Sequence, residues 1–167
     1  MSTEIKLVRV DFRLLHGQVV TNWIKQVSAD AVLIINDELV QDKFLANVFL
    51  MAAPPGVKVG IRSIEKAVEG LRNNVFKNKK LLILFKSVQD VKRAVDLGLE
   101  IKELQIGGLG IGSGTNKVMI SKELSLSKEE AKMLKDIEDK GIQVSLQVTP
   151  KDSKILLKTA LKEVLGE

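Results

Sequence analysis

The chain has 167 residues, of which 45% are hydrophobic and 28% are charged, and its formal net charge at pH 7 is +5. With no cysteine and a single histidine, it has no disulfides, thiolate catalysis, cysteine-ligated metal clusters or multi-histidine metal sites. The sequence lacks the apolar core of a signal peptide and any apolar run near the ~20 residues that span a bilayer. These features predict one cytosolic domain over residues 1–167.

The basic residues are mostly scattered lysines. Only five of the 26 basic residues are arginines, tyrosine is absent, and the six Phe and Trp residues are spread along the chain. Nucleic-acid-binding surfaces usually cluster their basic residues and add arginine or aromatic stacking partners. We therefore interpret the lysines as solvated helix faces with at most a mild preference for acidic or phosphorylated partners, and we expect no nucleic-acid partner.

Short apolar runs alternate with segments of helical periodicity. Segments 31–36 and 80–85 are continuously apolar, as strands buried on both faces of a parallel sheet are. In chain order we expect strand 5–11, helix 19–27, strand 31–36, helix 37–53, strand 57–61, helix 63–72, strand 80–85, helix 88–97, strand 103–108, helix 127–140, strand 142–148 and helix 150–165. This alternation with short links predicts an α/β fold with a mostly parallel central sheet and helices on both faces.

Several helices carry start signals. Asp37 is expected to cap the second helix, which a Pro-Pro-Gly sequence ends. Ser127 and Glu130 have the spacing of a capping box, and Pro150 suits the first turn of the last helix. Trp23 falls on the apolar face of the first helix, which indicates a core residue.

Ligands of open α/β sheets bind beyond the carboxyl ends of strands, where the strand order reverses. The first strand–helix loop, residues 11–17, commonly borders that crevice, and loops 36–37, 86–87 and 107–114 could face it as well. The glycine-rich segment 107–114 lacks both the dinucleotide-binding and the P-loop patterns. We interpret it as a turn, with a backbone-amide nest beside the crevice as the alternative.

His16, the only histidine, lies in the first of these loops. Without cysteine or a second histidine, its chemistry is limited to nucleophilic attack or general acid–base work, because a neutral imidazole can attack phosphorus. A phosphoryl group on His16 would meet unpaired amides at the positive end of the following helix. Arg13 could grip that group with two parallel hydrogen bonds, and Asp11 could orient the ring or Arg13. Spacing alone leaves two other interpretations of His16 open: a surface histidine without a function, or a general acid–base that acts on a small metabolite.

The stretch RVDFRLLHGQV, residues 9–19, resembles the active-site signature of the IIB component of the mannose/fructose/sorbose family of the bacterial phosphotransferase system, approximately R-[IV]-D-[DS]-R-[LF]-[IL]-H-G-Q-V. Four further segments resemble family segments in order and spacing, so the resemblance covers nearly the whole chain. These segments are INDELVQD (35–42), APPGVKV (53–59), LLILFKSVQDVKR (81–93) and LQIGGLG (104–110).

The resemblance implies a cytosolic phosphocarrier that associates with the inner face of the membrane through its transporter. His16 matches the nucleophile that takes phosphate from the IIA component and passes it to a sugar delivered by the IIC and IID membrane components. Arg13 matches the arginine that contacts the phosphate, and Asp11 matches the first acidic position. Gly17 and Gln18 match the helix start, where amides can face the phosphoryl group. The resemblance implies no cofactor, and neither metal nor nucleotide is required.

Phe12 departs from the pattern, because many members carry a second aspartate there; it either contacts a partner or packs inward. Ser87 follows the fourth predicted strand and either lines the same crevice or has a structural role. The sugar stays open among mannose, fructose, sorbose, N-acetylgalactosamine and related amino sugars, and a homodimer is compatible with the chain. The alternative function is a non-catalytic α/β domain that binds an anion or metabolite through Arg13 and the glycine-rich segment.

Overall fold

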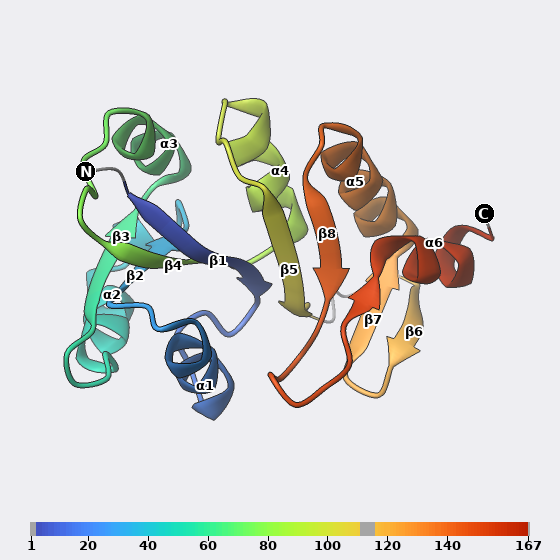
Figure 1. Ribbon diagram of the computed structural model, residues 1–167, viewed down its shortest axis with the longest axis horizontal. Coiled ribbons are helices and arrows are strands. Elements are labelled where there is room, and N and C mark those ends of the chain that lie inside the picture. The colour runs from blue at the N-terminus through green and yellow to red at the C-terminus, as the bar shows by residue number, and fades with distance from the viewer. Residues whose placement is uncertain (1–2, 111–115, 167) are drawn as a thin grey trace.

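The computed structural model describes residues 3–110 and 116–166, which form a central twisted sheet with helices on both sides (Figure 1). The strand order is β3-β2-β4-β1-β5-β8-β9, and the strands are parallel except for β9, which pairs antiparallel with β8. The bounds are β1 Glu4–Asp11, β2 Ala31–Ile35, β3 Lys58–Arg62, β4 Lys80–Phe85, β5 Glu103–Gly108, β8 Gln143–Leu146 and β9 Ile155–Leu156. The predicted fold class is confirmed.

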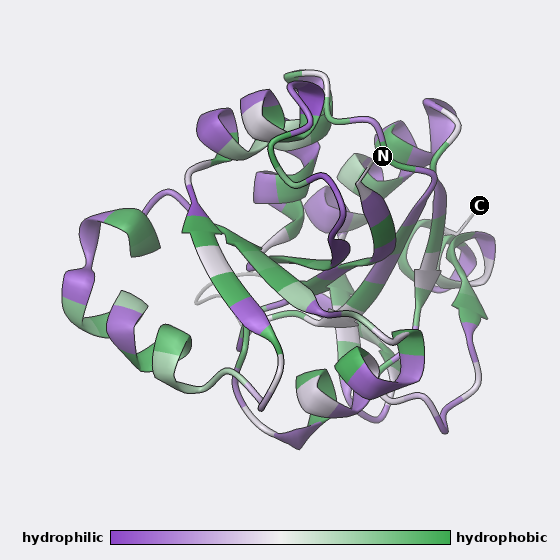
Figure 2. Cartoon of the chain, turned by 60° about the vertical axis from the view of Figure 1, so that its left-hand side comes forward, coloured by the Kyte–Doolittle hydropathy of each residue, from purple (hydrophilic) through white to green (hydrophobic). Residues whose placement is uncertain are grey.

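Two helices cover one face of the sheet, and the other helices pack against its opposite face or beyond its edge (Figure 1). Helices α1 (Gln18–Val27) and α2 (Lys43–Met51), with the 3-10 turn η1 (Leu39–Gln41), lie on the first face. On the opposite side are α3 (Ile64–Arg72), α4 (Val88–Asp96), α5 (Lys128–Asp139) and α6 (Leu157–Leu165), with the hairpin β6 (Lys117–Ser121) and β7 (Leu124–Ser127). In Figure 2 the helices are banded purple and green, as expected of helices that turn one apolar face toward a sheet.

The predicted helix over 37–53 is wrong at its start. Helix α2 is capped by Asp42, whose side chain accepts the Leu45 N–H at 3.0 Å. The Asp37 carboxylate instead accepts the Ile64 N–H at 2.8 Å and pairs with Arg93 at 2.6 Å. Because Asp37 serves the first turn of α3 and the side of α4, its neighbours form a short 3-10 turn before α2 begins.

The predicted helix over 150–165 also begins too early, because α6 starts only after β9. The Asp152 carboxylate accepts both the backbone N–H and the hydroxyl of Thr149 at 2.9 Å, which shapes a turn around Pro150 in place of a first helical turn. The β6–β7 hairpin and β9 were not predicted. The other helices and strands lie within two residues of their predicted ends.

Two local predictions are confirmed. Ser127 and Glu130 form the capping box of α5, with reciprocal bonds of 3.1 and 3.0 Å. Trp23 is 5% exposed and belongs to the core cluster beneath α1. Its indole N–H donates to the Val148 carbonyl at 2.8 Å, so it also joins α1 to the segment after β8.

The two halves of the sheet differ in how their faces are buried. Except for Lys80, every residue of β2 and β4 is buried, and both strands contribute side chains to both core clusters. On the face that α1 and α2 cover, β5 and β8 present Gln105, Gln143 and Ser145, and among the described residues neither strand contributes to the α1–α2 cluster. The sheet is therefore apolar on both faces at one end and polar on one face at the other, and β1 runs between the two halves.

Candidate active site

The loop between β1 and α1 lies where the strand order reverses. From β1 the chain passes through α1 to β2 on one side, and from β4 it passes through α4 across β1 to β5 on the other. The connections therefore leave this point in opposite directions, on opposite faces of the sheet (Figure 1). Such a reversal opens the crevice in which α/β sheets bind their ligands.

A cavity of about 520 Å³ opens at this crevice. Part of its lining comes from the segments after four strands: Phe12 after β1, Asn36 after β2, Lys86 and Ser87 after β4, and Leu109 and Gly110 after β5. The rest includes Lys117 of β6, Ser127 of β7 and Glu129 and Glu130 of α5, and of the loop 11–17 only Phe12 lines the cavity. The expectation that the four loops face one crevice is confirmed for the residues named after these strands, whereas residues 111–114 of the glycine-rich segment lie outside the described residues. Ser87 also caps α4, since its hydroxyl accepts the Asp90 N–H at 3.2 Å.

The loop between β1 and α1, residues 11–17, is called the active loop below, and its first half is fixed by hydrogen bonds and packing. The Phe12 N–H donates to the Gly108 carbonyl at 3.0 Å, and the Leu14 N–H donates to the Asp11 carbonyl at 2.9 Å. Leu14 and Leu15 are each 4% exposed and pack with the core beneath α1. Leu14 has a φ of 54°, a left-handed conformation that costs a non-glycine residue roughly 1–2 kcal/mol. Burial of the leucines offsets that cost and fixes the loop.

His16 is exposed at the end of this loop, and its ring makes no hydrogen bond or ion pair within the described part of the chain. Gly17 follows with a φ of 87°, a left-handed value suited to glycine, and α1 begins at Gln18. No side chain caps α1, so the amides of its first turn are open to an anion. The predicted placement of His16 before a helix start is confirmed.

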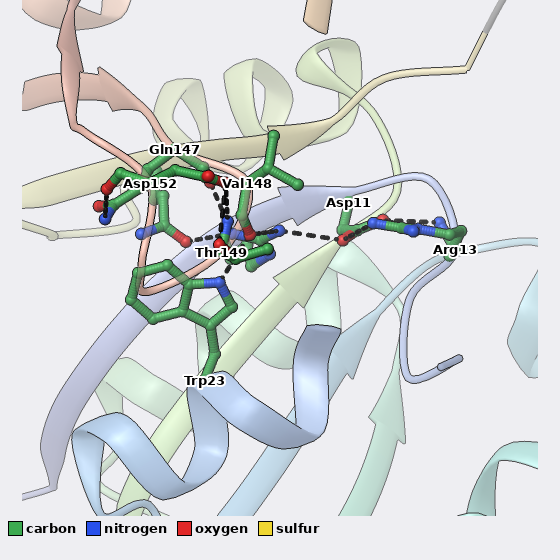
Figure 3. Close-up of polar contacts among 9 residues, drawn as sticks. Asp11, Arg13, Trp23, Gln147, Val148, Thr149 and Asp152 are labelled. Carbon is green, nitrogen blue, oxygen red and sulfur yellow. Dashed lines mark hydrogen bonds and ion pairs between the residues drawn. The ribbon is translucent and has the colours of Figure 1, made fainter. Parts of the chain in front are cut away.

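Arg13 is oriented by Asp11, which settles one of the open alternatives (Figure 3). The Asp11 carboxylate accepts Arg13 Nε at 3.1 Å, Nη2 at 3.2 Å and the Arg13 backbone N–H at 3.1 Å. A guanidinium has five N–H donors, so the hydrogens on Nη1 and one on Nη2 stay available for a phosphoryl group. Arg13 remains 34% exposed, whereas the Asp11 side chain is fully buried.

Arg9 belongs to the same network and was not assigned a role from the sequence. Its guanidinium is fully buried, donates to Asp11 at 3.3 Å, and binds the Gln105 side chain and the Gln147 and Val148 carbonyls. Burial lowers the pKa of Arg9 to about 10, so the side chain keeps its charge at neutral pH. The available signal was an arginine between two valines near the end of the strand.

None of the helices in residues 3–110 and 116–166 has the length and hydrophobicity that a membrane span requires. The same residues contain no group of three or more histidine, cysteine, aspartate or glutamate side chains arranged to hold a metal ion.

Comparison with known proteins gives a consistent match. Residues 5–165 match the model of the PTS system sorbose subfamily IIB component. The chain belongs to this family. It is 34% identical to the sorbose-specific EIIB component of Lacticaseibacillus casei over 98% of each chain. It also superposes on the crystal structure of manxB from Thermoanaerobacter tengcongensis with a TM-score of 0.88, at 38% identity over 96% of each chain. The mannose-specific EIIAB component of Escherichia coli is 26% identical over 96% of this chain and 49% of that protein.

As a IIB component, the chain is a phosphocarrier of PTS sugar transport and a phosphotransferase. The family also implies IIA, IIC and IID partners and a sugar. The family resemblance stated from the His16 motif is thereby confirmed. The alternative, a non-catalytic anion-binding or metabolite-binding domain, is not favoured by these relatives.

Proposed function

We propose that His16 carries the phosphoryl group, which it accepts from the IIA component and passes to a hexose or amino sugar delivered by the IIC and IID components. The observation that carries the proposal is the position of the only histidine. His16 is exposed at the uncapped start of α1, in the same short loop as Arg13. Asp11 binds the Arg13 guanidinium through Nε and Nη2, which leaves the other N–H groups of Arg13 available to a phosphoryl group. This arrangement combines a nucleophile with two kinds of oxyanion donor.

The chemistry consists of two displacements. A lone pair of the neutral His16 imidazole attacks phosphorus as the bond from phosphorus to the donor nitrogen breaks. A sugar hydroxyl then attacks the same phosphorus, the bond to His16 breaks, and the hydroxyl proton passes to solvent or a base. Arg13 and the amides of Gly17 and Gln18 would stabilise the charge spread over the three equatorial oxygens in both steps.

A relay must hold its phosphoryl group loosely. Every ~1.4 kcal/mol of extra stabilisation shifts the onward transfer equilibrium tenfold toward the phosphorylated carrier. The loop offers one partly exposed arginine and a helix start, while the second nearby arginine is buried against Asp11. This small set of ligands supports a transient carrier.

Partner contacts are proposed at the rim of the crevice. Phe12 is 44% exposed beside the Arg13 guanidinium, which lies 5.6 Å from its ring centroid, and Phe12 lines the cavity together with Ser87. We place the IIA contact on Phe12 and a supporting phosphate contact on Ser87. The E. coli EIIAB relative supports a IIA partner of the mannose/sorbose class, because this chain matches 49% of that protein's length. Binding to IIC and IID would bring the chain to the inner face of the membrane.

A reconstituted phosphorylation assay tests the role of His16. The protein is incubated with phosphoenolpyruvate, the general phosphotransferase proteins and a IIA component, and its intact mass is measured. The proposal predicts an acid-labile gain of one phosphate, which His16→Ala abolishes and which Ser87→Ala only slows. A phosphate that His16→Ala retains would contradict the proposal. Adding IIC and IID with a panel of sugars then identifies the acceptor.

A further inference from the structure

Arg9 is an unusual residue for the middle of a sheet. Arginine is almost never fully buried unless it is paired, and this side chain has no exposed surface. Its Nε has no hydrogen-bond partner among the described residues, although the other guanidinium nitrogens are bonded. Burial works against the charge and lowers the pKa of Arg9, so the fold keeps a cation here at a cost. Such a cost points to a role other than packing.

The first role is visible at Asp11, whose carboxylate accepts hydrogen bonds from two arginines, Arg9 and Arg13. Asp11 Oδ2 accepts Arg9 Nη2 at 3.3 Å and Arg13 Nη2 at 3.2 Å, while Oδ1 accepts Arg13 Nε at 3.1 Å. The Arg13 backbone N–H donates to Oδ1 at 3.1 Å, so the bond from Arg9 adds a fixed donor at the other oxygen. Because Arg9 is fixed in the sheet, the two bonds together orient the carboxylate and, through it, the Arg13 guanidinium.

The second role is visible at the turn of residues 147–152. Arg9 Nη1 donates to the Gln147 carbonyl and Nη2 to the Val148 carbonyl, both at 2.9 Å. The Trp23 indole donates to the same Val148 carbonyl, and its ring centroid lies 5.5 Å from the Arg9 guanidinium carbon. One guanidinium thus joins β1, the turn after β8 and, through Trp23, helix α1.

The neighbouring strand leaves space for this guanidinium. A Cβ on Gly107 would lie 1.9 Å from the Arg9 guanidinium carbon and 2.1 and 2.3 Å from its two terminal nitrogens. Any side chain at position 107 would therefore displace the group that holds Asp11. Lysine at position 9 could not reproduce the arrangement, because its single ammonium lacks the planar fork that reaches the carboxylate and both carbonyls at once.

We propose that Arg9 is a positioning residue for phosphoryl transfer, acting through Asp11 to set the orientation of Arg13, while its bonds to the Gln147 and Val148 carbonyls fix its own guanidinium in place. The proposal rests on the proposed function, in which Arg13 meets the phosphoryl group. Arg9 itself touches neither the phosphoryl group nor His16. Its contribution is to the geometry of transfer and not to the affinity for a partner.

Steady-state transfer from phosphorylated IIA to variants of this chain tests the proposal. Arg9→Met is expected to lower kcat by between about tenfold and a hundredfold, as a misplaced catalytic group does, with KM for IIA within twofold of the wild-type value. Arg9→Lys should fall between Arg9→Met and the wild type. Asp152→Ala is the matched control, because it loosens the same turn without touching Asp11, and its kcat should stay within about twofold of wild type.

Trp23, the only tryptophan, provides a second readout. Its fluorescence should shift in Arg9→Met, because the cation beside the ring is removed, and should change little in Asp152→Ala. A folded Arg9→Met with wild-type kcat, or an equal loss of kcat in Asp152→Ala, would overturn the proposal.

Gly107→Ala keeps the test decisive if Arg9→Met fails to fold. This variant keeps arginine at position 9 but displaces its guanidinium from Asp11, so it should lower kcat as Arg9→Met does. In the double variant with Arg9→Lys the shorter, unbranched side chain relieves the clash, and stability should recover. Wild-type kcat in a folded Gly107→Ala would contradict the proposal. Failure of the proposed function looks different: His16→Ala would still be phosphorylated, or the wild-type chain would not be phosphorylated by IIA at all.

Discussion

The two halves of the sheet differ in the side chains that they present on the face covered by α1 and α2. Strands β2 and β4 place ten of their eleven residues in the core, with helices against both faces. Strands β5 and β8 bury one face against α4, α5 and α6 and present amide and hydroxyl side chains on the other. The first half is a rigid apolar support. The second half can supply polar partners, and it supplies Gln105, the carbonyls after β8 and the space at Gly107.

The active loop leaves β1 where these halves meet. Arg9 of β1 takes Gln105 and the Gln147 and Val148 carbonyls as partners from the polar half and donates to Asp11, whereas Leu14 and Leu15 pack into the apolar half beneath α1. The loop that precedes the exposed His16 is thus fixed by the burial of Leu14 and Leu15 and by the charged network of Asp11 and Arg13. The comparison teaches that stability and site geometry draw on different strands, and substitutions can separate them.

The largest effect is expected for Asp11→Ala. Removing this carboxylate leaves the Arg9 charge buried without a counter-ion, which should lower the free energy of unfolding by about 3–5 kcal/mol. It also frees Arg13 to turn away from His16. Urea unfolding gives the stability, and phosphorylation of the folded fraction, corrected for its population, should fall sharply.

Leu82→Ala is the matched substitution in the apolar half. Leu82 has no exposed surface, and its truncation should cost about 2–5 kcal/mol, similar to Asp11→Ala. Phosphorylation per folded molecule should stay at the wild-type level. Equal losses of activity in the two variants would show that the halves do not have separate roles.

Gly17→Ala should have an intermediate effect. A Cβ at position 17 meets no atom within 4 Å, so the cost comes only from the φ of 87° and should be roughly 1–2 kcal/mol. If the backbone relaxes to avoid this strain, the start of α1 moves relative to His16. Unfolding curves together with the lifetime of the phosphorylated protein check this, and an unchanged stability would indicate that the loop adapts freely.

Gln143→Ala should change the free energy of unfolding by no more than about 0.5 kcal/mol, because Gln143 is an exposed residue of β8. Thermal unfolding measures the effect. A loss comparable to that of Leu82→Ala would contradict the division of the sheet into an apolar and a polar half.

The smallest effect concerns Asp90, at the rim of the crevice. Burial raises the pKa of Asp90, and the nearby Asp37 and Glu38 charges add to the shift. Because the folded-state pKa lies above the unfolded value, ionisation of Asp90 opposes folding; the penalty is complete above the raised pKa and disappears below the ordinary value. Asp90→Asn should therefore raise the Tm slightly at pH 7 and leave it unchanged near pH 3. A lower Tm at pH 7 would contradict this assignment.

Local patterns were enough to predict much of the fold. Continuous apolar runs marked β2 and β4, and the Ser127 capping box marked α5. The two incorrect helix starts have different causes. Asp37 binds the first turn of α3, 27 residues along the chain, a partner that spacing does not reveal. Asp152 acts locally, accepting from Thr149 three residues earlier, and this turn competes with the helix start that Pro150 fitted.

The candidate site shows the same limit. His16, Arg13 and the helix start could be predicted because they are consecutive in the chain. Arg9 could not be assigned a role, because its partners Gln105 of β5 and Gln147 and Val148 of the turn after β8 are brought beside it only by the folded topology.

The most direct test of the account is the NMR spectrum of the phosphorylated protein. Phosphorus NMR should show one phosphohistidine signal, and proton–nitrogen spectra should shift mainly at the amides of Gly17 and Gln18 and at the Arg13 guanidinium. Signals from β2 and β4 should stay in place. A phosphoryl group on another residue, or a phosphohistidine that leaves both Arg13 and the start of α1 undisturbed, would contradict the claim that this junction holds the phosphoryl group.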